Sequence, residues 1–305
     1  MKKVLVIGGS RFVGRVFSIF ASRNGGFELH VVNRGNHPMN LENVIQYKCD
    51  RHDPQEIARI IPDIKYDTLV DFCAYDPGDI SPLIGAVGDR IGQYIFISTA
   101  SVYAPGNDYL DENTPFQSIP ASDESPGANY VRNKIALENE LVESCGKTGL
   151  KYTILRPTFV YGPFNYAPRE SYFIEMIVKK HAVPVPVDAS ALFNFVYVID
   201  IANALMACID DDRAADKAFN LAESESITYD KLMSVFEANN GGKFETLDVT
   251  VAQVLDENIP LPFPLTDNVL INGESFADTF GFQYTPFREG MEKTFGIFRS
   301  LYETP

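Results

Sequence analysis

The chain has 305 residues, of which 45% are hydrophobic, so it can form one large domain or a large and a small one with an ample core. Its formal net charge is −15, and no segment is rich in Lys and Arg, which argues against a nucleic-acid partner. No apolar run approaches the ~20 residues of a membrane span, so we expect no membrane association.

The chain opens with a short apolar segment, a glycine-rich turn and a helical pattern. Residues 4–7 are uninterrupted apolar residues, as expected of a strand buried on both faces of a parallel sheet. Apolar residues then recur at helical spacing over 12–20. Gly8 and Gly9 lie in the turn between them, where a helix N-terminus can face a pyrophosphate. The alternative is an ordinary strand–helix turn.

Strands and helices are expected to alternate through the first half of the chain. Strand patterns occur at residues 4–7, 28–32, 44–48, 68–72, 94–98 and 152–155. Helical patterns fill most of the gaps, which predicts a doubly wound parallel sheet with right-handed crossovers. Segments 195–207 and 218–221 are interpreted as a return to this sheet.

Residues 104–129 interrupt the alternation. The segment is rich in Pro, Asp, Glu and Ser and is too long for an ordinary connection. Loops of that length tend to be functional or disordered. We interpret it as a flap over a substrate, and the alternative is a mobile surface loop.

Tyr130 and Lys134 lie four residues apart directly after this loop. Positions i and i+4 share one face of a helix, so both side chains can point into one cleft. A tyrosine has a pKa near ~10 and is a poor base at neutral pH. A nearby positive charge favours the phenolate, so the pair can move protons at a substrate hydroxyl or carbonyl. The alternative is a solvated helix pair.

The order of these motifs resembles that of the extended short-chain dehydrogenase/reductases, the group of NAD(P)-binding sugar-nucleotide epimerases and dehydratases. The resemblance rests on the glycine turn, the Tyr-x-x-x-Lys pair and residues 49–53, 70–74, 97–103, 154–163, 195–202 and 219–221. Gly-Gly-Ser-Arg-Phe-Val-Gly and Val-Asn-Arg-Gly are most similar to the branch that includes the chloroplast stem-loop-binding proteins.

This resemblance implies an α/β, Rossmann-type fold with a smaller, discontinuous C-terminal substrate lobe. The NAD(P)-binding domain would comprise residues 1–163 and about 193–221, and the substrate lobe residues 164–192 and about 222–305. The cleft between them would hold a nucleotide sugar or another small polyol. A homodimer is expected by analogy with the family.

The resemblance also implies a set of catalytic residues. Thr99 would hydrogen-bond the reacting oxygen, with Ser101 as the runner-up for this role. Tyr130 would be the general base or acid, and Lys134 would lower its pKa and hold the nicotinamide ribose. Ala100-Ser101 follow Thr99 where dehydratases usually carry an Asp-Glu pair, which favours epimerase-like or reductase-like chemistry over dehydration.

A second implied set of residues would bind the dinucleotide. Gly8, Ser10, Arg11, Phe12, Val13 and Gly14 would line its pyrophosphate, Asn33 and Arg34 its adenosine ribose, Asp50 and Arg51 its adenine, and Cys73, Ala74, Tyr75 and Lys134 its nicotinamide side.

Two departures from the family pattern bear on the choice of cofactor. Arg11 replaces the usual middle glycine, and Asn33 stands where an acidic residue often binds a ribose 2′-hydroxyl. The guanidinium groups of Arg11 and Arg34 suit a 2′-phosphate, which favours NADP slightly over NAD. The alternative is that Arg11 stacks on the adenine or lies on the surface, with Arg34 solvated.

Arg169 is the candidate for substrate binding. It follows the point where the chain is expected to enter the second lobe, and its planar guanidinium suits the diphosphate of a nucleotide sugar. The alternative is a surface ion pair with Glu170 or Glu175.

The remaining expectations concern metals, location and a second function class. The cysteines and histidines show no metal-ligand spacing, so we expect no metal site. Widely spaced cysteines and an N-terminal apolar run too short for a secretory signal favour the cytoplasm. The alternative function is a cofactor-binding regulatory or RNA-binding protein like the stem-loop-binding relatives.

Overall fold

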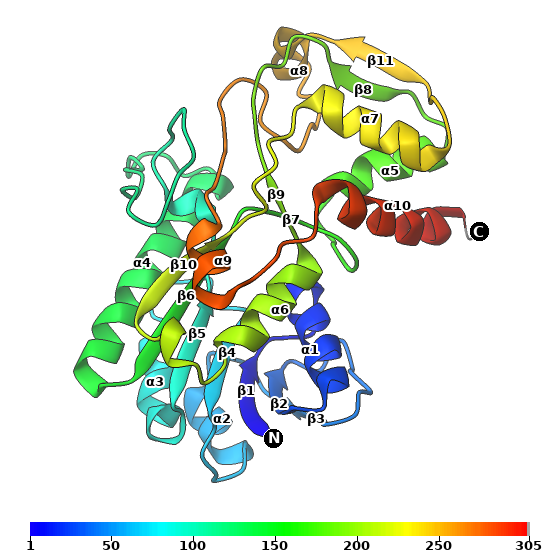
Figure 1. The fold of residues 1–305 in the computed structure, drawn as a ribbon. Helices are drawn as coiled ribbons and strands as arrows, with labels where there is room; N and C mark the ends of the chain where they lie inside the picture. The colour runs from blue at the N-terminus through cyan, green and yellow to red at the C-terminus, as the bar shows by residue number, and fades with distance from the viewer. Residues whose placement is uncertain (304–305) are drawn as a thin grey trace.

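A parallel β-sheet forms the centre of the larger lobe in the computed structural model, which describes residues 1–303 (Figure 1). Within these residues, seven strands pair in the order β10-β6-β5-β4-β1-β2-β3, and each pairing is parallel. The strands are β1 (Lys2–Ile7), β2 (Phe27–Asn33), β3 (Val44–Lys48), β4 (Thr68–Asp71), β5 (Gln93–Ile97), β6 (Lys151–Pro157) and β10 (Lys217–Leu221). The Rossmann-type doubly wound parallel fold is confirmed.

Helices cover both faces of this sheet because successive strand residues point to opposite sides. On β1, Val4 and Val6 pack in one core cluster with α1 (Phe12–Asn24) and α6 (Val198–Cys208). Leu5 and Ile7 pack in a second cluster on the other face. That face is covered by α2 (Pro54–Ile60), α3 (Ser81–Val87) and α4 (Pro126–Thr148). Short 3₁₀ turns occur after α3 at η1 (Gly88–Arg90), after β5 at η2 (Ala100–Val102) and after α6 at η3 (Asp212–Ala214).

The smaller lobe lies above the sheet in Figure 1 and is built from two strand pairs and short helices. The strand pairs are β7 (Phe159–Tyr161) with β9 (Phe195–Tyr197), and β8 (Val183–Pro186) with β11 (Thr246–Val249). The helices of this lobe are α5 (Glu170–Val178), α7 (Tyr229–Asn240), α8 (Val251–Asp256) and α10 (Phe287–Glu303), whereas α9 (Glu274–Phe280) packs against β10 of the larger lobe.

The expected return of the chain to the main sheet is met in part. β10 pairs with β6 at the edge of the sheet. β9, by contrast, pairs with β7 outside the main sheet, and α6 follows it onto one sheet face. One apolar cluster runs from β1 into the smaller lobe, where it includes Phe173 and Phe287. The domain boundaries drawn from the sequence therefore stay predictions.

The segment before Tyr130 is bound to other parts of the chain. Leu110 N donates to Leu270 O at 2.8 Å, and Leu110 O accepts from Asn272 N at 2.9 Å. The Glu112 carboxylate accepts from Asn220 N on β10 at 2.8 Å. These bonds do not fit a mobile surface loop, because they hold the segment against β10 and against residues 270–272, which precede α9.

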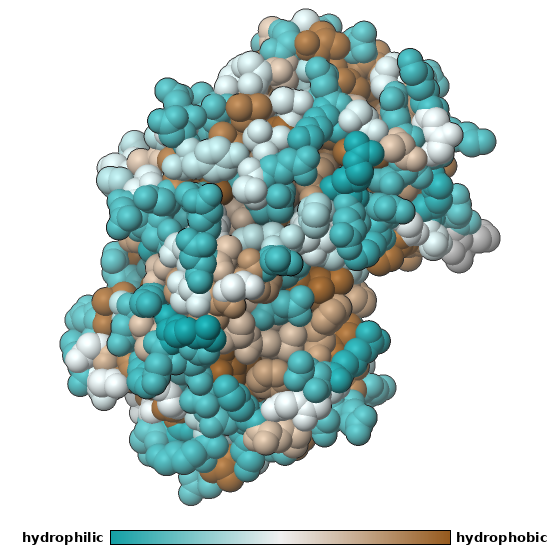
Figure 2. Space-filling model, viewed as in Figure 1, coloured by the Kyte–Doolittle hydropathy of each residue, from teal (hydrophilic) through white to brown (hydrophobic). Residues whose placement is uncertain are grey.

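Polar and apolar side chains are distributed unevenly over the molecular surface. The face shown in Figure 2 is mostly hydrophilic, and apolar side chains gather where α6 lies. Among residues 1–303, none of the helices combines the length and the apolar character that crossing a membrane requires.

Candidate functional site

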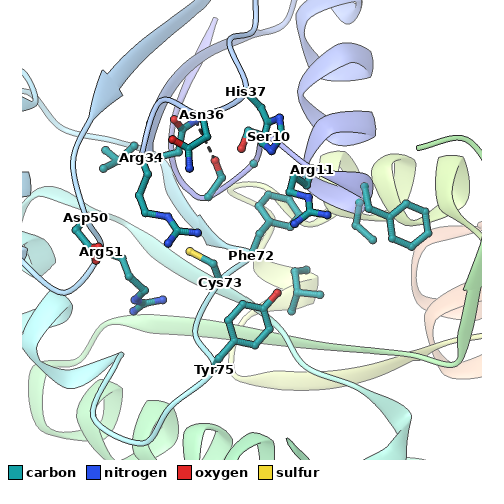
Figure 3. A pocket seen from close by; sticks show the side chains of 18 of the residues that line it. Ser10, Arg11, Arg34, Asn36, His37, Asp50, Arg51, Phe72, Cys73 and Tyr75 are labelled. Carbon is teal, nitrogen blue, oxygen red and sulfur yellow. Dashed lines mark hydrogen bonds between the residues drawn. The ribbon is translucent and has the colours of Figure 1, made fainter. Parts of the chain in front are cut away.

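A pocket of about 520 Å³ lies beyond the carboxyl ends of β1, β2 and β4 (Figure 3). β1 lies between β4 and β2, so the order of the strands reverses at this point. Open α/β sheets bind their ligands at such a switch point. The pocket is lined by Gly8, Gly9, Ser10, Arg11, Phe12, Val13, Gly14, Asn33, Arg34, Asn36, His37, Asp50, Arg51, His52, Phe72, Cys73, Tyr75, Ser98, Tyr130, Lys134 and Tyr166, among others.

The glycine turn forms the floor of the pocket. Gly8 and Gly9 have φ angles of 93° and 70°, which side chains rarely adopt. A Cβ atom on Gly14 would lie 2.6 Å from the Cα of Gly9, so helix and turn approach too closely for any larger residue. No side chain caps the N-terminus of α1 at Arg11, which leaves the first N–H groups of the helix available to an anion.

Arg11 has a partner that the sequence did not suggest. Its Cζ atom lies 3.9 Å from the ring centroid of Tyr166, in the segment between β7 and α5. Arg11 is therefore exposed but stacked on an aromatic ring, and its expected contact with a 2′-phosphate stays a prediction. Arg34 remains exposed at the edge of the pocket, where its charge contributes to a low pKa of Asp50, after the larger effect of the His52 N–H group.

Asn33 supports the turn that follows β2. The side chain is buried, and its Oδ1 atom accepts from Gly35 N and Gln46 Nε2, both at 2.8 Å. This turn brings Asn36 and His37 to the pocket, and neither residue was among the expected site residues. Their position two and three residues after Arg34 is the signal by which they could have been found.

Arg51 lines the pocket and is also bound to two carboxylates, so its expected place beside the adenine stays a prediction. Its side chain is 8% exposed and forms ion pairs with Asp71 at 2.9 Å and Asp79 at 3.5 Å. Tyr94 donates to the same Asp71 carboxylate at 2.6 Å. The guanidinium thus joins the carboxyl end of β4 to the loop after it, and Arg51 also lines the pocket.

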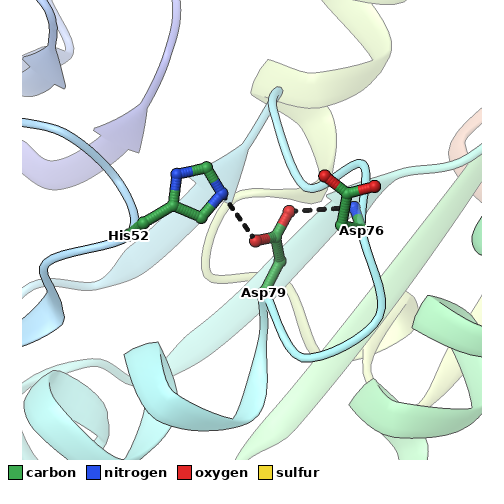
Figure 4. A group of neighbouring side chains, drawn as sticks. All are labelled: His52, Asp76 and Asp79. Carbon is green, nitrogen blue, oxygen red and sulfur yellow. Dashed lines mark hydrogen bonds and ion pairs between the residues drawn. The ribbon is translucent and has the colours of Figure 1, made fainter.

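His52, Asp76 and Asp79 lie close enough together to share an ion (Figure 4). Asp79 is already bound by the protein, because its Oδ2 atom accepts from Tyr75 N at 2.8 Å and Asp76 N at 3.1 Å. Its Oδ1 atom faces His52 Nε2 at 3.2 Å and the Arg51 cation at 3.5 Å. Repulsion from Arg51 opposes a divalent cation here, so we assign no metal to this group.

Lys134 lies on α4 and points at the ends of two strands. Its Nζ atom donates to the carbonyl oxygens of Ala74 at 3.0 Å and Ile97 at 2.9 Å. The residue is 3% exposed, and burial lowers the pKa of Lys134 to about 8. Ala74 does not line the pocket itself but holds Lys134 against it.

Tyr130 forms one wall of the pocket, with 41% of its surface exposed. Partial burial raises its pKa above the ordinary value, while a hydrogen bond with Thr99 and the charge of Arg169 act in the opposite direction. The expected effect of Lys134 on this pKa is not seen, because its Nζ atom lies 5.9 Å from the Tyr130 ring centroid and bonds to carbonyl groups.

Thr99 and Ser101 lie together at the end of β5. Thr99 Oγ1 donates to Ser101 Oγ at 3.2 Å and accepts from Ser101 N at 3.1 Å, so it caps the 3₁₀ turn η2. Thr99 is buried and Ser101 is exposed. Both lie outside the 520 Å³ pocket; Thr99 interacts with Tyr130, Ser101 is bound to Thr99, and both remain candidates for the hydroxyl role.

Arg169 is half-buried at the start of α5 and does not line the pocket. The surface ion pair considered for it is not formed among the described residues. Glu175 pairs with Lys179, and Glu170 accepts from Gly162 N and Asn165 Nδ2, both at 3.0 Å. Against the larger effect of burial, the positive charge of Arg169 lowers the pKa of Tyr130. The two side chains therefore lie near each other although they come from different lobes.

Comparison with known proteins agrees with this geometry. Residues 82–222 match the NAD dependent epimerase/dehydratase family. The family resemblance is confirmed. The chain is 25% identical to the chloroplast stem-loop binding protein of 41 kDa b of Arabidopsis thaliana over 246 residues, or 76% of this chain and 61% of that protein. It is 23% identical to the UDP-glucose 4-epimerase of Vibrio cholerae over 145 residues, or 47% and 42%.

Solved structures of sugar-nucleotide epimerases share the fold. The UDP-glucuronic acid 4-epimerase of Bacillus cereus in complex with NAD superposes with a TM-score of 0.79 at 16% identity, covering 99% of this chain and all of that one. The UDP-glucose 4-epimerase of Thermotoga maritima with UDP-glucose gives 0.79 at 20% identity, with coverage of 99% and 100%. Both curated sequence relatives are matched over less than two thirds of their length.

Proposed function

We propose that the protein is an NAD(P)-dependent sugar-nucleotide enzyme of the extended short-chain dehydrogenase/reductase group, with epimerase-like or reductase-like chemistry. The observation that carries the proposal is the position of Tyr130 and Lys134 in the wall of the pocket that the glycine turn opens. A proton-transfer group thereby stands beside a site with the shape and donors for a pyrophosphate.

The residues present fit a dinucleotide. A Cβ atom on Gly8 would lie 3.1 Å from Cys73 Sγ, so the glycine keeps open a space that a side chain would fill. The uncapped N-terminus of α1 faces the same space and suits a diphosphate. When bound, a nicotinamide group supplies a hydride acceptor and donor. NADP remains slightly favoured, with Arg34 as the residue for the 2′-phosphate.

The residues of the chain itself would position the substrate and move its proton. Tyr130 takes a proton from a sugar hydroxyl or returns it, and Thr99 or Ser101 hydrogen-bonds the reacting oxygen. Arg169 stabilises the Tyr130 phenolate and meets the diphosphate of the substrate. Lys134, held by two carbonyl groups, contacts the nicotinamide ribose. A homodimer in the cytoplasm completes the proposal by analogy with the family.

The relatives and structural neighbours support a nucleotide sugar as the substrate class, because several of them are UDP-sugar 4-epimerases. The alternative of an RNA-binding regulatory protein is not favoured. A net charge of −15 opposes binding to a phosphate backbone, and the matched region covers 61% of the stem-loop binding protein.

The test is a thermal-shift panel in which NAD or NADP is combined with UDP-, GDP- and dTDP-sugars, followed by turnover assays on each combination that binds. A true ligand raises the melting temperature by mass action. We expect one dinucleotide to stabilise the protein alone and one sugar nucleotide to add to that shift. A protein that neither dinucleotide stabilises would contradict the proposal.

A further inference from the structure

Tyr166 extends over the pocket from the segment between β7 and α5. Its ring stacks on Arg11, with 3.9 Å from the Cζ atom to the ring centroid, and meets Phe12 edge-on at 6.2 Å between centroids. Tyr166 is nonetheless 59% exposed. Its orientation therefore depends on residues of the glycine turn and not on burial in the core.

Tyr166 lines the same pocket as Tyr75 and Tyr130. Arg11 and Tyr75 point into the pocket from opposite sides (Figure 3). After the larger effect of burial, the nearby Tyr166 phenol contributes to the raised pKa values of Tyr75 and Tyr130. Tyr166 thus lies beside the glycine turn in the pocket that Tyr75 and Tyr130 also line.

The backbone that carries Tyr166 is firmly held. Glu170 is fully buried and accepts from Gly162 N and from Asn165 Nδ2, both at 3.0 Å. Asn165 Oδ1 in turn accepts from Ala167 N at 3.0 Å. These bonds hold the backbone in place, while the exposed Tyr166 side chain is held mainly by its ring contacts with Arg11 and Phe12.

We propose that Tyr166 is a cover that closes over the bound dinucleotide and slows its dissociation, with Arg11 as its stacking partner. The inference rests on the proposed function. It accounts for the arginine at a position where the family usually has glycine, because a glycine offers no group for the ring to stack on. An enzyme that returns a hydride to its own substrate benefits from keeping the reduced cofactor through the cycle.

The test is the rate of NAD(P)H release, followed by stopped-flow fluorescence after mixing with excess oxidised dinucleotide. The chain contains no Trp, so the signal of the cofactor stands alone. We expect Tyr166→Ala to raise the release rate at least fivefold, and Tyr166→Phe, which keeps the ring, to change it less than twofold. The matched control is Tyr109→Ala, which removes a tyrosine that is 44% exposed and lies outside the pocket.

Arg11→Gly and the double variant test the stacking itself. If both residues act through one contact, Arg11→Gly accelerates release as Tyr166→Ala does, and the double variant is no faster than either single one. Additive effects on the release rate would contradict a shared Arg11–Tyr166 contact. An unchanged release rate in Tyr166→Ala would contradict the role of Tyr166 as a cover, while leaving the proposed function standing. Absence of NAD(P)H binding by the unmodified protein would overturn the proposed function and the cover with it.

Discussion

Arg156 on β6 binds the carboxylate of Glu138 on α4 through three hydrogen bonds of 3.1, 3.2 and 2.6 Å. Both side chains are almost completely buried. The pair also bonds Ser98 Oγ, at the end of β5, and the Tyr103 hydroxyl. Glu138 lies one helical turn after Lys134, so this network fixes the face of α4 that carries Lys134 against the strand ends that hold the lysine.

Loss of this ion pair should destabilise the protein strongly. Glu138→Gln leaves the Arg156 cation buried without a counter-charge, which should lower the free energy of unfolding by about 3 kcal/mol. Urea unfolding measures the change. The control Glu143→Gln removes an exposed i,i+4 partner of Lys147 and should leave the midpoint almost unchanged. Equal midpoints for the two variants would contradict the assigned role.

Tyr130→Phe should abolish turnover and leave dinucleotide binding nearly unchanged. The phenol is assigned to proton transfer, whereas the glycine turn and the N-terminus of α1 anchor the cofactor. Turnover and a fluorescence titration with NAD(P)H separate the two effects. Tyr109→Phe removes a hydroxyl that donates to Ser224 O and serves as the control. A cofactor affinity that falls as steeply as turnover would disprove this division of roles.

Arg34→Ala should weaken NADP binding much more than NAD binding. A lost charge-assisted contact to the 2′-phosphate should cost roughly 1.5–3 kcal/mol. Arg11→Ala is the comparison, because Arg11 stacks on Tyr166 and should affect both cofactors alike. Calorimetry with each dinucleotide measures the difference. Equal losses of NAD and NADP affinity in Arg34→Ala would rule out the 2′-phosphate role.

Arg169→Ala should raise the KM of the nucleotide sugar at least tenfold, which corresponds to about 1.4 kcal/mol, with cofactor affinity unchanged. It should also move the limb of the kcat profile that requires phenolate to higher pH, because the charge of Arg169 lowers the Tyr130 pKa. Arg169→Lys keeps the charge and should shift the limb less. An unchanged KM together with an unchanged pH profile would contradict both proposed roles of Arg169.

Glu170 should make the protein less stable as pH rises from about 4.5 to about 7. Burial raises its pKa to about 7 in the folded state, so the folded protein holds this proton after the unfolded chain has lost it. Stability therefore falls across that window, by about 3 kcal/mol in total. Urea unfolding at the two pH values should show a flatter dependence in Glu170→Gln. The exposed control Glu175→Gln should keep the dependence of the unmodified protein.

The larger lobe could be predicted from local patterns. Apolar runs such as residues 4–7 and the helical spacing after them depend on backbone periods of two and 3.6 residues, which hold wherever the segment lies. The strand prediction at 152–155 falls within β6 (Lys151–Pro157), and the return at 218–221 falls within β10. The pairing of β9 with β7 was missed, because three-residue strands carry too little pattern to show their partner.

The sequence by itself determined the parallel sheet, the glycine turn and the shared face of Tyr130 and Lys134, since each is a consequence of short-range spacing. Only the tertiary structure decided what the charged groups contact. Arg11 meets Tyr166, Arg51 turns inward to Asp71, and Arg169 acts on Tyr130. Arg51 and Asp71 meet because β3 and β4 lie in one sheet, whereas the other two pairs meet because the two lobes pack together, and no local spacing encodes either arrangement.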